Sequence, residues 1–281
     1  MSRPTRTRGA TSIRDSGRYA LIALQLTSDY LYDSVLPDGR KCHRIYFTHV
    51  RKTGGTSLYK SFLSLGGEDP AQVLTRMNHG VKARSGPYSF ACSDRSFVFR
   101  MARYNFGWSH LPAWQLHLKP GTFTVSILRD PISRVISLFR HLADERADEG
   151  ERFHARADER AWAADGFATF LDQADRVQLL NQLYAFSSRF DPVEAAERIR
   201  GYSLYFFSEH YNEGVAALAN RLGLPLAPRV DRVSVAETLP TGTQVARLRE
   251  ILDPEYKLLD LLRVAPGPGF VGTVPPRVPL R

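Results

Sequence analysis

The stretch 45-IYFTHVRKTGGTSLYKSFLSLGG-67 passes from an apolar run through a glycine loop into a patterned segment. Residues 43–50 are rich in β-forming side chains and predict a short strand. Leu58, Phe62 and Leu65 follow at spacings of four and three, which predicts a helix over residues 56–65 with one apolar face. A strand, a glycine loop and a helix in this order direct backbone N–H groups and a helix N-terminus toward a bound anion.

The loop between this strand and helix, 51-RKTGGTS-57, carries the groups that an anion needs. Its two glycines allow a tight turn and a close approach to a ligand, and successive N–H groups can form an anion-binding nest. Lys52 adds a positive charge, and Thr53, Thr56 and Ser57 add hydroxyl groups. The lysine precedes the glycines, whereas an ATP-binding P-loop places it after them. The loop predicts an anion site of another type; a plain turn that caps the helix is the alternative.

A second candidate site follows the run 122-TFTVSIL-128, which is apolar and β-branched and predicts another strand. Arg129 stands at its carboxyl end, and a helix is expected from Pro131, a residue suited to the first helical turn. Ser137 lies a little over two turns after Arg129, so the two side chains can face one side. Because arginine suits bidentate phosphate binding, the pair predicts a second anion site. In the alternative, Arg129 pairs with Asp130 and Ser137 is merely exposed.

The rest of the chain continues the alternation of strands and helices, which predicts an α/β fold with a mostly parallel sheet. Further strands are expected at 96–102 and 202–209, helices at 160–186, 210–222 and 243–263, and loops over 66–95. The charged segment 143–160 is expected to be a solvated linker or an exposed helix. We expect one domain over residues 19–264, between a disordered basic tail (1–18) and a Pro/Gly-rich tail (265–281).

The overall composition is that of a soluble globular protein, with 281 residues, 43% hydrophobic and 24% charged. A net charge of +9 favours anionic partners such as nucleic acid, anionic lipid, nucleotides or acidic glycans. Two cysteines without a CxxC motif argue against a zinc ribbon or a redox dithiol. No apolar run reaches transmembrane length, and the short run 19–26 lacks a signal-peptide cleavage site, so we expect a cytoplasmic protein.

The two loop motifs together resemble those of PAPS-dependent sulfotransferases, most closely the branch of bacterial sulfotransferases and heparan sulfate 2-O-sulfotransferases. The string 52-KTGGTS-57 resembles the family's loop for the 5′-phosphosulfate of PAPS. The string 129-RDPISRVIS-137 resembles the family's Arg-Asp-Pro-x-x-Arg-x-x-Ser segment, whose arginine and serine hold the 3′-phosphate. The likeness extends more weakly over residues 43–263. It implies a three-layer sandwich of the P-loop-NTPase type, with a central, mostly parallel sheet flanked by helices.

The resemblance also implies an activity, the in-line transfer of a sulfuryl group from PAPS to a hydroxyl acceptor without a metal ion. Lys52 would stabilise the oxygen of the leaving phosphate. Arg129 and Ser137 would hold the 3′-phosphate. The residues implied for the 5′-phosphate are Thr53, Gly54, Gly55, Thr56 and Ser57, with Arg51 as a weaker candidate. Arg232 and Ser234 stand where some members close a loop over the 3′-phosphate.

The general base that the reaction needs is expected at His110, because the resembling branch has a histidine upstream of the Arg-Asp-Pro strand. Ser109 stands where that branch often has glycine, and a structural histidine in an aromatic loop is the alternative. The reserve candidates are His79, His117, Asp94 and Glu209. Arg134 either contributes to the site or pairs with a local acid. The aromatic residues Tyr104, Phe106, Trp108 and Trp114 line an acceptor pocket or belong to the core.

Three other functions remain open from the residues alone. A P-loop kinase or NTPase would require ATP and a divalent metal, but the order of lysine and glycines is against it. A nucleic-acid-binding protein fits the positive charge, yet no helix-turn-helix, zinc finger or RNP motif supports it, so we expect no nucleic-acid partner. The third is an inactive sulfotransferase-like binding module. A glycan, a small alcohol or phenol, a lipid or a peptide all remain possible as acceptors, and no metal site is expected.

Overall fold

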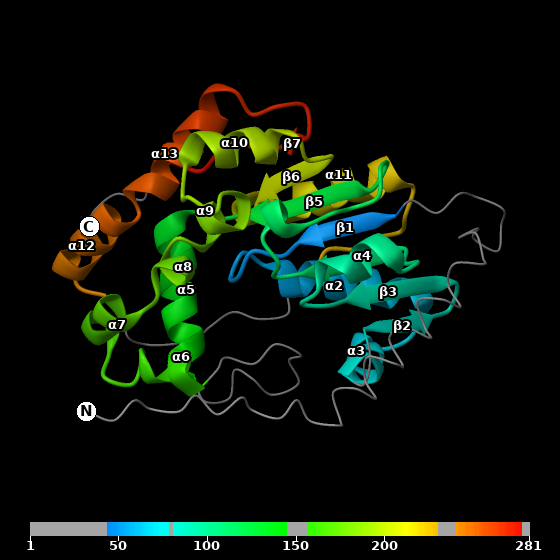
Figure 1. The fold of residues 1–281 in the computed structure, drawn as a ribbon, viewed down its shortest axis with the longest axis horizontal. Helices are drawn as coiled ribbons and strands as arrows, with labels where there is room; N and C mark the ends of the chain where they lie inside the picture. The colour runs from blue at the N-terminus through cyan, green and yellow to red at the C-terminus, as the bar shows by residue number, and fades with distance from the viewer. Residues whose placement is uncertain (1–43, 79–80, 145–156, 230–239, 277–281) are drawn as a thin grey trace, which may run out of the picture.

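The computed structural model describes residues 44–78, 81–144, 157–229 and 240–276, and a sheet between helices forms its centre (Figure 1). In these residues the sheet has seven strands in the order β2-β3-β4-β1-β5-β6-β7. They are β1 (Ile45–Thr48), β2 (Lys82–Ser85), β3 (Tyr88–Cys92), β4 (Phe106–Ser109), β5 (Phe123–Leu128), β6 (Leu204–Phe207) and β7 (Phe270–Val271). Every neighbouring pair is parallel except β2 and β3. The prediction of a mostly parallel sheet is confirmed.

Strand β1 lies in the middle of the sheet, with β4 on one side and β5 on the other. After β1 the chain moves to β2, β3 and β4 on the first side, whereas after β5 it moves to β6 and β7 on the second. The connections that leave β1 and β5 therefore run in opposite directions. Open α/β sheets bind ligands at the carboxyl ends of strands at such a switch point. Both anion motifs predicted from the sequence follow these two strands.

Helices cover both faces of the sheet, which gives three layers. The helices are α2 (Gly55–Leu63), α3 (Pro70–Asn78), α4 (Ser96–Met101), α5 (Pro131–Ala143), α6 (Ala157–Ala161), α7 (Phe167–Gln173), α8 (Arg176–Leu179), α9 (Asn181–Phe186), α10 (Pro192–Arg200), α11 (Tyr211–Leu222), α12 (Gly242–Ile251) and α13 (Asp253–Val264). Short 3-10 turns occupy Ser64–Gly66, Ala113–Gln115 and Ser208–His210. No helix in the described ranges is long and apolar enough to cross a membrane.

The alternation of side chains along the strands explains why each face needs its own helices. Phe206 packs with α2, α3 and α11 on one face, whereas its neighbours Tyr205 and Phe207 pack with α10 and α13 on the other. In β1, Phe47 joins the first face and Tyr46 packs against α4 on the opposite one. Strands buried on both faces are typical of parallel sheets in α/β proteins. This packing confirms the three-layer α/β fold.

The predictions for residues 66–102 were wrong in two places. The expected loops over 66–95 contain α3 and the β2–β3 hairpin. The run 96–102, expected as a strand, forms α4, in which Val98 and Phe99 are buried while Phe97 and Met101 are exposed. The apolar and β-branched residues of this short run suggested a strand, but Val98, Phe99 and Ala102 all pack in the cluster that contains Tyr46, and this spacing of one and three residues fits one face of a helix.

The C-terminal half also departs from the prediction. The single helix expected at 160–186 is divided among α6, α7, α8 and α9, and helix α10 was missed. The Pro/Gly-rich segment expected as a tail from residue 265 adds strand β7 to the edge of the sheet. Its two residues are too few to give an alternating pattern, so only the pairing with β6 defines the strand. The extent of a single domain over 19–264 stays a prediction.

Candidate functional site

The two predicted anion loops lie side by side at the carboxyl ends of β1 and β5, which are parallel neighbours in the sheet. Arg129 follows β5, and its Nη1 donates a hydrogen bond to the backbone oxygen of Lys52 at 3.1 Å. The residues are 77 positions apart in the chain. The structure thus brings the arginine of the second motif into contact with the glycine loop of the first.

Two residues of the glycine loop have the left-handed backbone conformation that anion-binding nests use. Lys52 and Gly54 have positive φ angles of 66° and 89°. Helix α2 begins at Gly55, and its N-cap residue is Gly54, which has no side chain to cap it. Thr53 is buried, and its hydroxyl donates to the backbone oxygen of Val50 at 2.9 Å, which closes the turn internally. The alternating backbone and the uncapped helix N-terminus leave positive partial charges where an anion could bind.

His49, at the end of β1, is a buried residue that the sequence analysis did not single out. Its ring stacks on Phe47 with centroids 5.2 Å apart. A Cβ atom added to Gly55 would lie 2.1 Å from Cδ2 of this ring, so the glycine is needed for close packing. The Nδ1 atom of His49 is buried without a hydrogen-bond partner in the described structure. Burial, followed by the nearby His110 and Lys52, lowers the pKa of His49 well below its ordinary value.

His110, the predicted general base, lies directly after β4 and beside His49, with ring centroids 4.4 Å apart. The 2.7 Å contact between its Nδ1 and the backbone oxygen of His49 requires Nδ1 to be the donor, because a carbonyl only accepts. In the neutral ring, Nε2 then carries the lone pair. Burial and, next, the positive charge of Arg51 lower the pKa of His110 to about 4, so the ring is neutral at pH 7.

The side chain of Arg51, proposed from the sequence as a weaker cofactor ligand, contacts two other parts of the protein. Its guanidinium donates to both carboxylate oxygens of Glu159 at 3.0 and 3.2 Å and to Gln178 at 2.9 Å. Its backbone N–H donates to Asn181 at 3.1 Å. These partners come from α6, α8 and α9, so Arg51 connects the glycine loop to three helices. Glu159 is buried although it lies in the segment expected to be solvated.

The second loop is held by a set of polar contacts around Arg129 and Asp130. Asp130 caps α5 by accepting from the backbone N–H of Ser133 at 2.8 Å, and its other oxygen accepts from Tyr256 at 3.0 Å. Its own N–H donates to Glu209 at 3.0 Å. Burial lowers the pKa of Arg129, while the negative charges of Glu209 and Asp130 oppose this shift. Glu209, a reserve base candidate, therefore lies on the Arg129 side of the site.

The remaining residues of the second motif differ in role. Arg134 is fully buried on α5 and pairs with Glu255 of α13 at 3.8 Å, so its acidic partner is distant in the sequence rather than local. Its other contacts are to the backbone oxygens of Gln178 and Leu179. Ser137 is half-buried one turn farther along α5.

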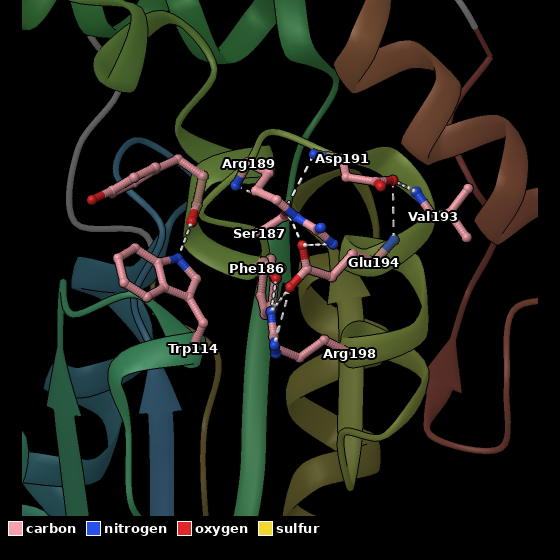
Figure 2. Close-up of polar contacts among 9 residues, drawn as sticks. Trp114, Phe186, Ser187, Arg189, Asp191, Val193, Glu194 and Arg198 are labelled. Carbon is pink, nitrogen blue, oxygen red and sulfur yellow. Dashed lines mark hydrogen bonds and ion pairs between the residues drawn. The ribbon is translucent and has the colours of Figure 1, made fainter.

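The aromatic residues considered for an acceptor pocket belong mostly to the core. Tyr104, Phe106 and Trp108 are each 1% exposed, within clusters that pack against the sheet. Trp114 is half-buried, and its indole N–H donates to the backbone oxygen of Tyr184 on α9 at 2.9 Å (Figure 2). Trp114 is thus anchored to the same helix as Asn181, which contacts the glycine loop.

Other candidates lie elsewhere or cannot be placed. Asp94 and His117 are exposed, and Oδ1 of Asp94 lies 3.9 Å from Nε of the neighbouring Arg95. His79, Arg232 and Ser234 lie outside the described residues. In the described ranges, no group of three or more His, Cys, Asp or Glu side chains is arranged to hold a metal ion.

Comparison with known proteins identifies the family. No curated protein matches the sequence significantly. A family model, described as the sulfotransferase family, matches residues 40–256. The match contains both loops, the sheet from β1 to β6 and the helices that hold Arg51 and Arg129. Since it spans well over half of the sequence, the chain belongs to the sulfotransferase family.

Proposed function

We propose that this protein transfers a sulfuryl group from PAPS to a hydroxyl acceptor. The observation that carries the proposal is the hydrogen bond from Arg129 to the backbone oxygen of Lys52, because it puts two anion-binding loops next to each other. PAPS has a phosphosulfate at one end and a 3′-phosphate at the other, so it needs two neighbouring anion sites. The family match supports sulfuryl transfer in general. The donor and the sub-branch are part of the proposal.

The glycine loop has the features expected of the 5′-phosphosulfate site. The positive φ angles of Lys52 and Gly54 and the uncapped start of α2 favour a bound anion. The backbone of Thr53, Gly54 and Gly55, together with Thr56 and Ser57, would hold the phosphate. PAPS, when bound there, supplies the sulfuryl group and a nucleotide phosphate as leaving group. Lys52 would stabilise the negative charge on the leaving oxygen.

Arg129 and Ser137 would hold the 3′-phosphate. Arg129 is half-buried, and a partly desolvated guanidinium binds a phosphate more strongly than an exposed one. Glu209 works against this assignment, because its carboxylate acts on the same guanidinium. Arg51 is proposed to brace the glycine loop rather than to contact the cofactor, since Glu159 and Gln178 engage its side chain.

His110 would accept the proton of the acceptor hydroxyl. Its Nδ1 donates to the backbone oxygen of His49, so Nε2 is the basic nitrogen. The lowered pKa of His110, about 4, keeps the ring neutral at physiological pH but also limits its strength as a base. A neutral ring, rather than an imidazolium, also avoids competition with Lys52 for the negative charge on the leaving group.

Calorimetric titration with adenosine 3′,5′-bisphosphate, in parallel with ATP plus Mg²⁺, tests this function. The wild type should bind the bisphosphate without metal, and Arg129→Ala should weaken binding about tenfold or more, since a charged hydrogen-bond donor is lost. Arg76→Ala is the matched control, because Arg76 lies on α3, on the opposite face of the sheet from α5, and pairs with Glu68. Binding of ATP only with Mg²⁺, or of neither nucleotide, would overturn the proposal and favour a kinase, a nucleic-acid-binding protein or an inactive module.

A further inference from the structure

Gln182 is a fully buried residue of α9 whose side chain contacts both backbone polar groups of Arg129. The backbone N–H of Arg129 donates to Oε1 of Gln182 at 2.7 Å, and Nε2 of Gln182 donates to the backbone oxygen of Arg129 at 2.9 Å. The two residues are 53 positions apart. One amide therefore fixes the backbone of Arg129 from both sides, as a neighbouring strand would.

The orientation of this amide is determined by its partners. The N–H of Arg129 can only donate, and its carbonyl can only accept, so Oε1 and Nε2 of Gln182 cannot exchange places. Nε2 also donates to Oε2 of Glu255 at 3.2 Å. The N–H of Gln182 donates to the other oxygen of Glu255 at 2.8 Å, and that of Leu183 does so at 3.2 Å. Glu255 thus holds both the backbone and the side chain of Gln182.

Glu255 is itself fully buried, opposite the fully buried Arg134. Arg134 also donates to the backbone of Gln178 and Leu179, and its Nε is buried without a partner in the described structure. A buried ion pair of this kind is seldom a net source of stability, because desolvation of the two charges opposes their attraction. The hydrogen bonds of Gln182 and Glu255 also satisfy the backbone groups of Arg129, Gln182 and Leu183, so the network fixes where these segments lie relative to one another.

The group that the network positions is the start of the second anion loop. From Arg129, whose backbone Gln182 holds, the guanidinium reaches the backbone oxygen of Lys52. We propose that Gln182, oriented by Glu255, is a positioning residue that sets the location of Arg129 for binding the 3′-phosphate. This inference rests on the proposed function.

Two explanations of the network make different predictions. If Gln182 only stabilises the fold, replacing it should change nucleotide binding equally whether or not Arg129 is present. If it acts through Arg129, its effect on binding should disappear once the guanidinium is removed. A double-mutant cycle separates the two, because the coupling between the substitutions measures the shared interaction.

The experiment measures the affinity for adenosine 3′,5′-bisphosphate by calorimetry in Gln182→Met, Arg129→Ala and the double variant. Methionine keeps the volume of Gln182 and removes both hydrogen bonds to Arg129. We expect Gln182→Met to weaken binding about tenfold in the wild-type background and less than about twofold in Arg129→Ala. Ser187→Ala, at the other end of α9, is the matched control, because Ser187 is also buried and bonded to a glutamate.

Equal effects of Gln182→Met in both backgrounds, or no effect in a folded variant, would overturn the inference. If Gln182→Met does not fold, Gln182→Asn replaces it, since asparagine keeps both polar ends but is one methylene too short to reach Arg129. The same cycle then applies with the same criteria. If Arg129→Ala alone leaves binding of the bisphosphate unchanged, the proposed function fails, and the positioning role fails with it.

Discussion

The two ends of helix α9 each contact a glutamate, and the two glutamates are in opposite settings. At the first turn, Glu255 is fully buried and binds Gln182 and Arg134. At the last turn, Glu194 of α10 is half-buried and accepts from Ser187 at 2.6 Å (Figure 2). Arg198 contacts Glu194 at 3.4 Å. Both are carboxylates near an arginine, so burial is the main physical difference between them.

This difference reverses the direction of the two pKa shifts. Burial raises the pKa of Glu255, against the opposing effect of Arg134 and the surrounding N–H donors. The hydrogen bond from Ser187 lowers the pKa of Glu194, and the nearby arginines add to this effect. The end of α9 that contacts the candidate site thus holds a carboxylate at an energetic cost, whereas the far end holds one in a favourable setting. The first end of α9 thus holds Gln182 through a carboxylate whose charge burial opposes.

The largest expected effect comes from removing each glutamate in turn. Glu255→Ala should lower the free energy of unfolding by about 3–5 kcal/mol, because it leaves Arg134 buried without its partner. Glu194→Ala should cost much less, since Arg198 stays in contact with solvent and with the backbone oxygen of Phe186. Urea denaturation of both variants measures the difference. Equal losses in the free energy of unfolding would contradict the conclusion that burial distinguishes the two glutamates.

A second test compares a glycine beside the candidate site, at the start of α2, with a glycine at the end of α10. Gly55→Ala should lower the free energy of unfolding by about 1–3 kcal/mol, because the new Cβ would lie 2.1 Å from the ring of His49. Gly201, which ends α10, is the control, since a Cβ there would meet its nearest atom at an ordinary 3.4 Å. Thermal unfolding compares the two alanine variants. A destabilised Gly201→Ala beside an unaffected Gly55→Ala would contradict the described packing of His49.

The pH dependence of stability should separate the two carboxylates. Because the pKa of Glu255 is raised in the fold, its contribution to stability is fully present below the unfolded pKa and is lost as pH rises through the folded value. For Glu194 the pKa is lowered, so its contribution is present above the unfolded pKa and is lost as pH falls through the folded value. Denaturation across pH should show that Glu255→Gln removes the first dependence and Glu194→Gln the second. If Glu255→Gln removed the second dependence and Glu194→Gln the first, the directions assigned to the two pKa shifts would be wrong.

The smallest effect is expected at Glu209, which holds the N–H of Asp130 as Gln182 holds that of Arg129. Glu209→Gln keeps an oxygen for this N–H but removes the negative charge that acts on Arg129. Binding of adenosine 3′,5′-bisphosphate should therefore become a few times tighter, with the gain reduced at high salt. Calorimetry at two salt concentrations measures it. Weaker binding in Glu209→Gln would show that the carboxylate supports the site.

The elements that were predictable from the sequence are those whose signals are local. The glycine loop, the Arg-Asp-Pro segment and the strands around them are contiguous, so composition and spacing identified β1, α2, β5 and the start of α5. The cap of α5 is local as well, since Asp130 accepts from Ser133 three residues later. Elements with short or mixed patterns, such as α4 and β7, were missed or misassigned because tertiary packing determines them.

The support of the candidate site could not be predicted for the same reason. Glu159 reaches Arg51 across 108 positions, and Glu255 reaches Gln182 across 73. Nothing near either glutamate in the sequence marks it as buried, because its partner lies in a distant segment. His49 is an intermediate case: the glycine pair that follows it allows the close contact with Gly55, but only the structure shows that the ring lies against that residue.

The hydrogen bond between Arg129 and the backbone oxygen of Lys52 has a thermodynamic consequence for ligand recognition. Under the proposed function this contact joins the two anion sites, so an anion bound at one loop can change how firmly the other loop is held. Linkage then requires reciprocity: if inorganic phosphate at the glycine loop strengthens the binding of a 3′-phosphate at Arg129, the 3′-phosphate strengthens the binding of inorganic phosphate by the same factor. An intact nucleotide with phosphates at both ends would gain from this coupling, whereas a nucleotide with only one would not. Selection of the doubly charged donor can thus reside in the contact between the loops as well as in each loop alone.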